Sequence, residues 1–212
     1  MVLSSLRWRA LIGLLLLTIL AQPLLQGSAV MEALGAVIYA FLCMATRAAA
    51  GSRSVGPATG SGAPVVWLGL NLVARWTDSP GLDALALAAS VALVGLMAWL
   101  VVESLLRRQM ADSDALAGAV FGYVLLAVAW AQVYVAVEFW SPGAFAGPFE
   151  TPAVDDLLYF SMVTLTTLGY GDVLPVAPMA RVLSGMEALV GTLYIAVLIG
   201  RIVSEFRPGG AD

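Results

Sequence analysis

A short glycine-containing stretch, residues 166–172 (Thr-Thr-Leu-Gly-Tyr-Gly-Asp), carries the most specific chemistry in the sequence. Gly169 and Gly171 alternate with larger residues, and glycine tolerates left-handed backbone conformations that other residues avoid. An alternation of left- and right-handed residues can turn successive carbonyl oxygens to the same side of a strand. Four such strands around an axis would form stacked rings of oxygens that replace the hydration shell of an ion. The stretch therefore predicts a cation site built from peptide carbonyls, to which the Thr167 hydroxyl adds one more ring.

The residues before this stretch predict a short helix over 151–167. Thr151 is expected to cap the helix and Pro152 to occupy its first position. From Pro152 to Thr166 the helix would be about 22 Å long, which is shorter than the ~30 Å hydrocarbon core of a bilayer. The chain must then return as irregular backbone, which survives at membrane depth only where it lines a polar cavity or is buried in protein. The carbonyl end of the helix would favour a cation.

The composition places this stretch in a membrane protein. The 212 residues are 61% hydrophobic and 11% charged, whereas a soluble domain has roughly 45–50% apolar and 25% charged residues. The chain has no histidine, a single cysteine and a net charge of −4. These counts exclude most catalytic triads and zinc sites, and no basic stripe points to nucleic acid. We expect an integral membrane protein and not an ordinary soluble enzyme.

Six apolar runs are expected to cross the membrane, with the short helix and its return between the fifth and the sixth. The runs cover residues 10–25, 29–46, 64–76, 82–106, 115–139 and 180–206. The third run is short for a crossing, Pro64 suits its first helical position, and a flexible loop is expected before it over 48–63. Six crossings would place eight of the ten arginines inside, which favours cytoplasmic termini. Residues 1–29 have an alternative interpretation as a cleaved signal peptide.

The stretch from Thr167 to Asp172 resembles the selectivity filter of the potassium channel family, in which valine is usual at the position of Leu168. Residues 157–166 resemble the family's pore helix, and residues 133–138 resemble the outer helix of its six-helix members. The resemblance is specific over residues 115–206. It extends to the first 110 residues by helix count alone.

The resemblance implies an all-α membrane fold with six transmembrane helices, a re-entrant pore helix, and a homotetramer around one pore, as in prokaryotic-type channels. It divides the chain into a four-helix, sensor-like domain (1–110) and a pore domain (111–212). It implies potassium bound at Thr167, Leu168, Gly169 and Tyr170, with no other cofactor. Gly171 completes the filter and Asp172 lies at the outer mouth. Thr166, Tyr159, Phe160 and Glu138 are expected to support the filter, with Glu138 bracing the pore helix, and Gly191 to act as a hinge.

Two features of the last predicted span each have two interpretations. A stripe of Thr192, Ile195, Ile199 and Val203 is expected to line the cavity or gate, although ordinary helix packing would explain it equally well. Glu187 lies inside an apolar run, where acids are costly and usually paired or functional. We expect it to hydrogen-bond to the back of the short helix; the alternative is a protonatable gate. Tyr170 is expected to brace the filter from behind.

The expected function is a potassium-selective channel of the cell membrane, with potassium, lipid and further copies of the chain as its partners. Residues 82–106 contain no arginine, so weak voltage dependence is expected. One alternative is a non-conducting or weakly selective cation channel subunit. Another is an intramembrane aspartyl protease, because Gly169–Asp172 also matches its Gly-x-Gly-Asp string. That enzyme needs a second aspartate within a facing span, and the predicted spans contain only Asp83, at the very start of the run over 82–106.

Overall fold

The computed structural model describes residues 2–25, 57–77, 79–107 and 113–205, and the chain is mostly helical in these ranges. Two short strands pair antiparallel, with Phe145 opposite Pro175 and Ala146 opposite Leu174. The elements are α1 (Val2–Leu25), α3 (Pro57–Trp76), α4 (Pro80–Leu106), α5 (Ser113–Trp140), β1 (Phe145–Ala146), α6 (Val154–Leu165), β2 (Leu174–Pro175), α7 (Pro178–Leu193), the π-helical η1 (Tyr194–Ile199) and α8 (Gly200–Glu205).

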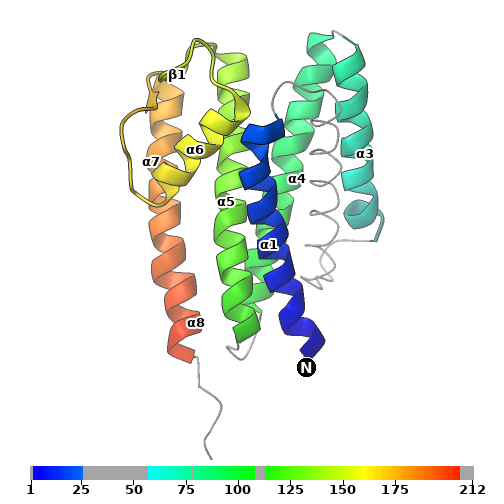
Figure 1. The fold of residues 1–212 in the computed structure, drawn as a ribbon, viewed down its shortest axis with the longest axis vertical. Coiled ribbons are helices and arrows are strands. Elements are labelled where there is room, and N and C mark those ends of the chain that lie inside the picture. Colours follow the sequence, from blue (N-terminus) through cyan, green and yellow to red (C-terminus); the bar gives the residue numbers. More distant parts are fainter. Residues whose placement is uncertain (1, 26–56, 78, 108–112, 206–212) are drawn as a thin grey trace, which may run out of the picture.

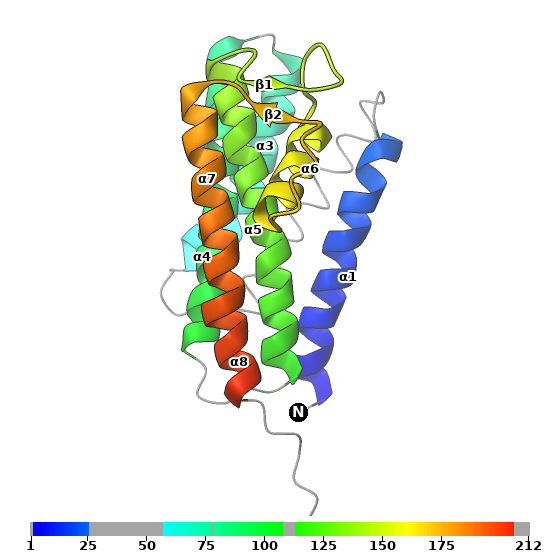
Figure 2. The ribbon, with the colours of Figure 1, turned by 90° about the vertical axis from the view of Figure 1, so that its left-hand side faces the viewer.

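Helix α5 lies at the centre of the arrangement and packs against α1, α4, α6 and α7 (Figure 1). The interior between α1, α4 and α5 is apolar and includes Trp8, Met97 and Phe121, which are all fully buried. The short helix α6 is tilted beside α5, near the end of the bundle that carries β1 and β2 (Figure 2). The start of α1 and the end of α8 both lie at the opposite end of the bundle.

Three of the described helices are long and apolar enough to cross a membrane: Pro80–Leu106, Leu116–Trp140 and Pro178–Ile199. They correspond to the fourth, fifth and sixth predicted spans. The apolar parts of α1 and α3, Trp8–Leu20 and Gly62–Ala74, are shorter. The second predicted span, 29–46, lies outside the described residues. Six crossings therefore remain a prediction, whereas a helical protein with membrane-capable helices is established.

Helix α3 begins earlier than the sequence predicted. Pro64 lies inside the helix, not at its first position, and residues 57–63 are helical instead of belonging to a loop. A proline in a helix interior removes one backbone hydrogen bond, a defect that is tolerated in apolar helices when neighbouring groups compensate. The predicted loop is therefore wrong over 57–63, because glycine, serine and proline are compatible with an apolar helix. Residues 48–56 of the predicted loop lie outside the described residues.

The short helix also differs from its predicted bounds. It begins at Val154, with Ala153 rather than Thr151 at the N-cap position. The carboxylate of Asp156 accepts a hydrogen bond of 2.8 Å from the Ala153 backbone N–H, so an acid inside the first turn satisfies the exposed helix start. The start of α6 is therefore satisfied by a carboxylate three residues after the cap position, and not by the predicted threonine.

The last predicted span is one continuous helical rod with an irregular centre, in which α7, η1 and α8 follow one another directly. The six residues of η1 form a π-helix, whose hydrogen bonds reach one residue further than those of an α-helix. Spacings of three and four residues therefore no longer mark one face across this segment. The predicted stripe of lining residues assumed α-helical spacing throughout, and that assumption was wrong.

Candidate functional site

The glycine-containing stretch follows α6 directly, and its first residues are hydrogen-bonded to the C-terminal end of this helix. The backbone N–H groups of Leu168 and Gly169 donate to the carbonyl oxygen of Val163, at 2.8 and 3.1 Å. The Thr167 N–H donates to the Thr164 carbonyl at 2.9 Å. These bonds use carbonyl groups that a helix end leaves without intrahelical partners. Any shift of α6 must therefore move the first residues of the stretch with it.

Three alternate residues of the stretch have left-handed backbones. The φ angles are +58° at Thr167, +52° at Gly169 and +80° at Gly171. The two glycines adopt this conformation without steric cost, but a β-branched residue such as threonine is a genuine outlier there. The left-handed conformation expected for the two glycines is present. The alternation begins at Thr167, two residues before the first glycine. Thr167 was predicted for its hydroxyl, and no feature of the sequence indicated its left-handed backbone.

The side chains of this stretch are uncovered in the single chain. Leu168 is 54% exposed and Tyr170 is 68% exposed. Tyr170 was expected to support the strand from behind, but in a single chain its side chain is mostly exposed. Phe160 is buried and packs with Tyr134 and Phe145, so its ring supports the position of α6. The hydroxyl of Thr166 donates back to Met162, inside the last turn of α6.

Tyr159 and Asp172 join α6 to the far end of the stretch. The Tyr159 hydroxyl donates to the Asp172 carboxylate at 2.7 Å. This bond lowers the pKa of Asp172, and it raises the pKa of Tyr159 to about 12. Of the predicted supporting residues, Tyr159 is therefore the one whose side chain contacts the end of the stretch.

Tyr159→Phe should destabilise the fold most at neutral pH. The lowered pKa of Asp172 means that the bond stabilises the fold above the ordinary pKa of aspartate, and that this contribution disappears as the pH falls through the lowered value. The raised pKa of Tyr159 means that the contribution is also lost as the pH rises through about 12. Unfolding midpoints of native protein and variant, measured across pH, should converge at both extremes. A constant difference across the acid range would contradict the role of Asp172.

Glu138 holds the loop that follows α5. Its carboxylate accepts hydrogen bonds from the backbone N–H of Gly143 at 2.7 Å and of Phe145 at 3.3 Å. The same loop continues into β1, which pairs with β2 beyond the stretch. The resemblance had implied that Glu138 braces the pore helix. Its hydrogen bonds run instead to the loop, because the chain turns back at Gly143, where φ is +80°, and brings its N–H groups to the carboxylate.

Glu138→Ala should lower the free energy of unfolding by about 1.5–3 kcal/mol, the cost of hydrogen bonds to a charged group when buried donors lose their partner. Chemical unfolding in detergent would measure the change. Glu150→Ala is a matched control, because Glu150 is an exposed acid further along the same loop, and it should have little effect. Equal losses for the two variants would show that net charge, and not the loop contact, is responsible.

A buried polar cluster joins three helices behind the stretch. Glu187 of α7 is fully buried, and its carboxyl group contacts the hydroxyls of Ser161 on α6 and Tyr134 on α5. The Ser161 oxygen lies 2.5 Å from Glu187 Oε1 and also 2.8 Å from the carbonyl oxygen of Ala127. The contact between Glu187 and the back of the short helix was expected from the sequence and is present.

Gly191 is a close-packing position. A Cβ placed there would run into the carbonyl oxygen and the side chain of Leu165, the last residue of α6. The predicted hinge role remains untested, and the structure adds a packing role. Among the predicted lining residues, Thr192 and Ile195 are exposed, whereas Ile199 packs against the apolar interior. The side chain of Val203 lies outside the described part of the chain.

Two tyrosines that were not predicted as functional residues form hydrogen bonds in the same region. The Tyr123 hydroxyl donates to the carbonyl oxygen of Leu165, and the Tyr194 hydroxyl donates to that of Ala119, both at 2.9 Å. The rings of Tyr123 and Tyr194 also contact each other, with centroids 5.5 Å apart. A tyrosine within an apolar run must find a partner for its hydroxyl, and this signal could have identified both residues.

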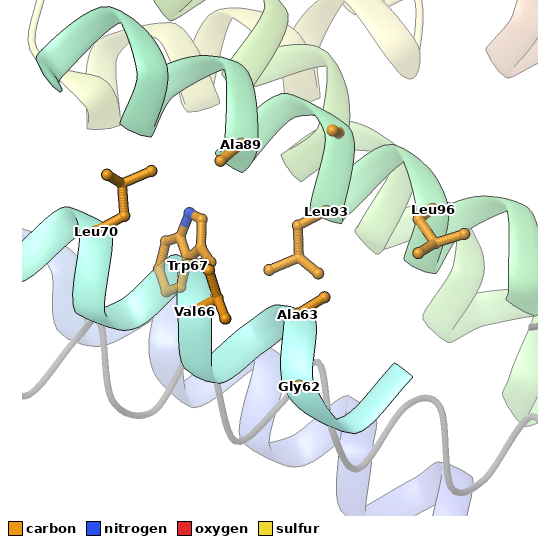
Figure 3. Close-up of a pocket in the computed structure, with 9 residues that line it drawn as sticks. Gly62, Ala63, Val66, Trp67, Leu70, Ala89, Leu93 and Leu96 are labelled. Atoms are coloured by element: carbon orange, nitrogen blue, oxygen red, sulfur yellow. The ribbon is translucent and has the colours of Figure 1, made fainter. Parts of the chain in front are cut away.

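A pocket between α3 and α4 is a poorer candidate site. Figure 3 shows Trp67 between the two helices, with Ala63, Leu70 and Leu93 around it. The lining is apolar apart from the indole, and the indole N–H already donates to the Ser90 hydroxyl at 2.7 Å. The pocket therefore offers no cluster of polar groups toward a ligand.

The comparison with protein families matches the part of the chain that contains α6. Residues 122–207 match the ion channel family. The chain is 34% identical over 89 residues to a voltage-gated potassium channel of Aeropyrum pernix, covering 41% of this chain and 28% of that protein. It is 35% identical over 85 residues to an inward rectifier potassium channel, Kirbac3.1, of Paramagnetospirillum magnetotacticum, covering 40% and 26%.

A third relative is two pore potassium channel c of Oryza sativa subsp. japonica, which is 44% identical over 66 residues, covering 30% of this chain and 14% of that protein. The chain therefore spans less than a third of the length of these relatives. No solved structure matches the chain. The matches support a relationship to potassium channels through an ion channel domain, and they indicate a channel rather than an enzyme.

Proposed function

We propose that this chain is one subunit of a potassium-selective channel in the cell membrane. The observation that carries the proposal is the alternation of left-handed residues at Thr167, Gly169 and Gly171, in a stretch suspended from the end of α6. Such an alternation brings carbonyl oxygens to one side, where Thr167, Leu168, Gly169 and Tyr170 would coordinate K⁺. The potassium channel relatives support the choice of ion.

Four identical chains would complete the pore. One chain supplies a single strand, and a ring of oxygens around an ion needs several. The exposed Leu168 and Tyr170, together with the exposed apolar residues Met186, Leu189 and Leu193 of α7, are suited to burial between copies. The described helix ends support cytoplasmic termini, because α1 starts and α8 ends at the side of the bundle away from β1. Asp172 would then lie at the outer mouth.

Weak voltage dependence is part of the proposal. Helix α4 contains no arginine between Pro80 and Leu106, and a voltage sensor needs several charges within the membrane. A non-conducting or weakly selective subunit is the alternative.

Flux in proteoliposomes tests the function. Purified protein should take up rubidium or potassium faster than sodium, while vesicles without protein take up neither. Size measurement in detergent should give four copies per particle. Equal sodium and potassium flux would overturn selectivity, and a monomeric particle would overturn the shared pore. A steep depolarisation-activated conductance would contradict the assignment of weak voltage dependence.

A further inference from the structure

The buried cluster around Glu187 contains more contacts than an ionised carboxylate can satisfy. The Ser161 hydroxyl lies within hydrogen-bond distance of two oxygens, Glu187 Oε1 at 2.5 Å and the Ala127 carbonyl at 2.8 Å. A hydroxyl carries one proton and donates to one of them. If Glu187 were ionised, both oxygens would be acceptors, and one of the two contacts would have no proton in it.

A protonated Glu187 satisfies every contact. Its own proton goes from Oε1 to the Ser161 oxygen, the Ser161 proton goes to the Ala127 carbonyl, and the Tyr134 hydroxyl donates to Oε2. Among the described residues, the groups hydrogen-bonded to this carboxyl are the hydroxyls of Tyr134 on α5 and Ser161 on α6, which are neutral. A fully buried carboxylate without a cation in contact is costly, whereas a neutral acid with complete hydrogen bonds is not.

The cluster also determines the position of α6. Ser161 lies two and three residues before Val163 and Thr164, whose carbonyl groups hold the start of the filter. Its hydroxyl contacts the Ala127 carbonyl of α5 and the Glu187 carboxyl of α7. We propose that Glu187 is a positioning residue that acts as a neutral carboxylic acid, joining α5, α6 and α7 so that the filter carbonyls keep their spacing. This inference rests on the proposed function as a selective channel.

Infrared spectroscopy tests the protonation without any measurement of flux. At neutral pH the native protein should show the carbonyl stretch of a protonated carboxylic acid, and this band should be missing in Glu187→Gln. The two proteins differ only at residue 187, so a band that is present in the native spectrum and missing in the variant belongs to Glu187. A native protein that is folded and lacks the band would overturn the neutral acid, whether or not the channel is selective.

Ion preference tests the positioning role. Glutamine can donate to Ser161 and accept from Tyr134, so Glu187→Gln should keep the preference for rubidium over sodium within about twofold of the native value. Glu187→Leu and Ser161→Ala leave buried polar groups without partners, and the preference should fall by about tenfold or more. If folded Glu187→Leu kept the native preference, or if Glu187→Gln lost it equally, the positioning role would be wrong.

Ser90→Ala is the matched control. The Ser90 hydroxyl is buried in α4, donates to the Ala86 carbonyl at 2.8 Å and accepts from the Trp67 indole. Ser90→Ala therefore also removes a buried hydroxyl that makes two hydrogen bonds. It lies between α3 and α4, away from α6, and should lower stability without changing ion preference. A native protein without any preference would reject the proposed function, whereas the infrared band would still decide the protonation of Glu187.

Discussion

Gly171→Ala is expected to abolish the preference for potassium over sodium while the protein still assembles. Gly171 has a φ of +80°, and a residue with a Cβ pays roughly 1–2 kcal/mol to stay in the left-handed region. Open space surrounds the position within one chain, so the strain comes from the backbone and not from a clash. Relief of that strain rotates the peptide group between Tyr170 and Gly171. The Tyr170 carbonyl then points away from the side on which the other carbonyl oxygens of the stretch lie. Rubidium and sodium uptake by proteoliposomes would measure the loss.

The same substitution at Gly143 separates backbone strain from selectivity. Gly143 also has a φ of +80° and also has no atom within 4 Å of an added Cβ, but it lies in the loop after α5. Gly143→Ala should cost a similar amount of stability and leave ion preference unchanged. If both variants lost the preference, general destabilisation would explain the result. If Gly171→Ala kept the native preference, the carbonyl filter would be the wrong account of this stretch.

Gly191→Ala is expected to remove flux and to lower the unfolding temperature together. The added methyl group would meet both the carbonyl oxygen and the side chain of Leu165, so α7 and the end of α6 must separate. Forcing atoms into a packed contact typically costs about 1–3 kcal/mol. The Tyr123 hydroxyl holds the same carbonyl from α5, which limits how far Leu165 can retreat. Thermal unfolding in detergent and flux in vesicles would measure the two effects.

Gly95→Ala provides the comparison for a glycine inside a helix. Gly95 lies within α4, and an added Cβ there would meet nothing within 4 Å. Alanine is favoured over glycine in a helix interior by about 1 kcal/mol, so this variant should be as stable as the native protein or more so. A Gly191→Ala protein with native stability and flux would show that α7 and α6 are not held in close contact.

The apolar runs predicted the helices best. The spans expected over 82–106 and 115–139 are observed as Pro80–Leu106 and Ser113–Trp140, because long apolar segments have few alternatives to a helix. Predictions based on loop and capping residues were weaker. Glycine, serine and proline before Pro64 are helical, and the start of α6 is satisfied by Asp156 instead of Thr151. Local signals fail where an apolar setting or a nearby carboxylate supplies the missing partner.

The left-handed backbone of the stretch 166–172 was predicted from its glycines, but the contacts that hold this stretch were only partly predictable. The sequence singled out Tyr159 and Glu138 without indicating their partners, Asp172 and the loop N–H groups. The bond from Tyr123 to Leu165 was not foreseen. It depends on how α5 is rotated about its axis, and a helix that is apolar on all sides gives no sequence signal for that rotation.

The π-helical segment η1 changes how the last helix must be compared with the corresponding helices of related proteins. One α-helical residue corresponds to about 100° of rotation, so the wider turns of η1 give α8 a different angular phase from α7. A helical wheel drawn through Thr192 and continued to Ser204 would assign the second residue to the wrong side. A homologue that lacks one residue within 194–199 and is α-helical throughout would present equivalent faces at both ends. An alignment gap at this point is therefore compatible with an unchanged set of residues on each face of the last helix.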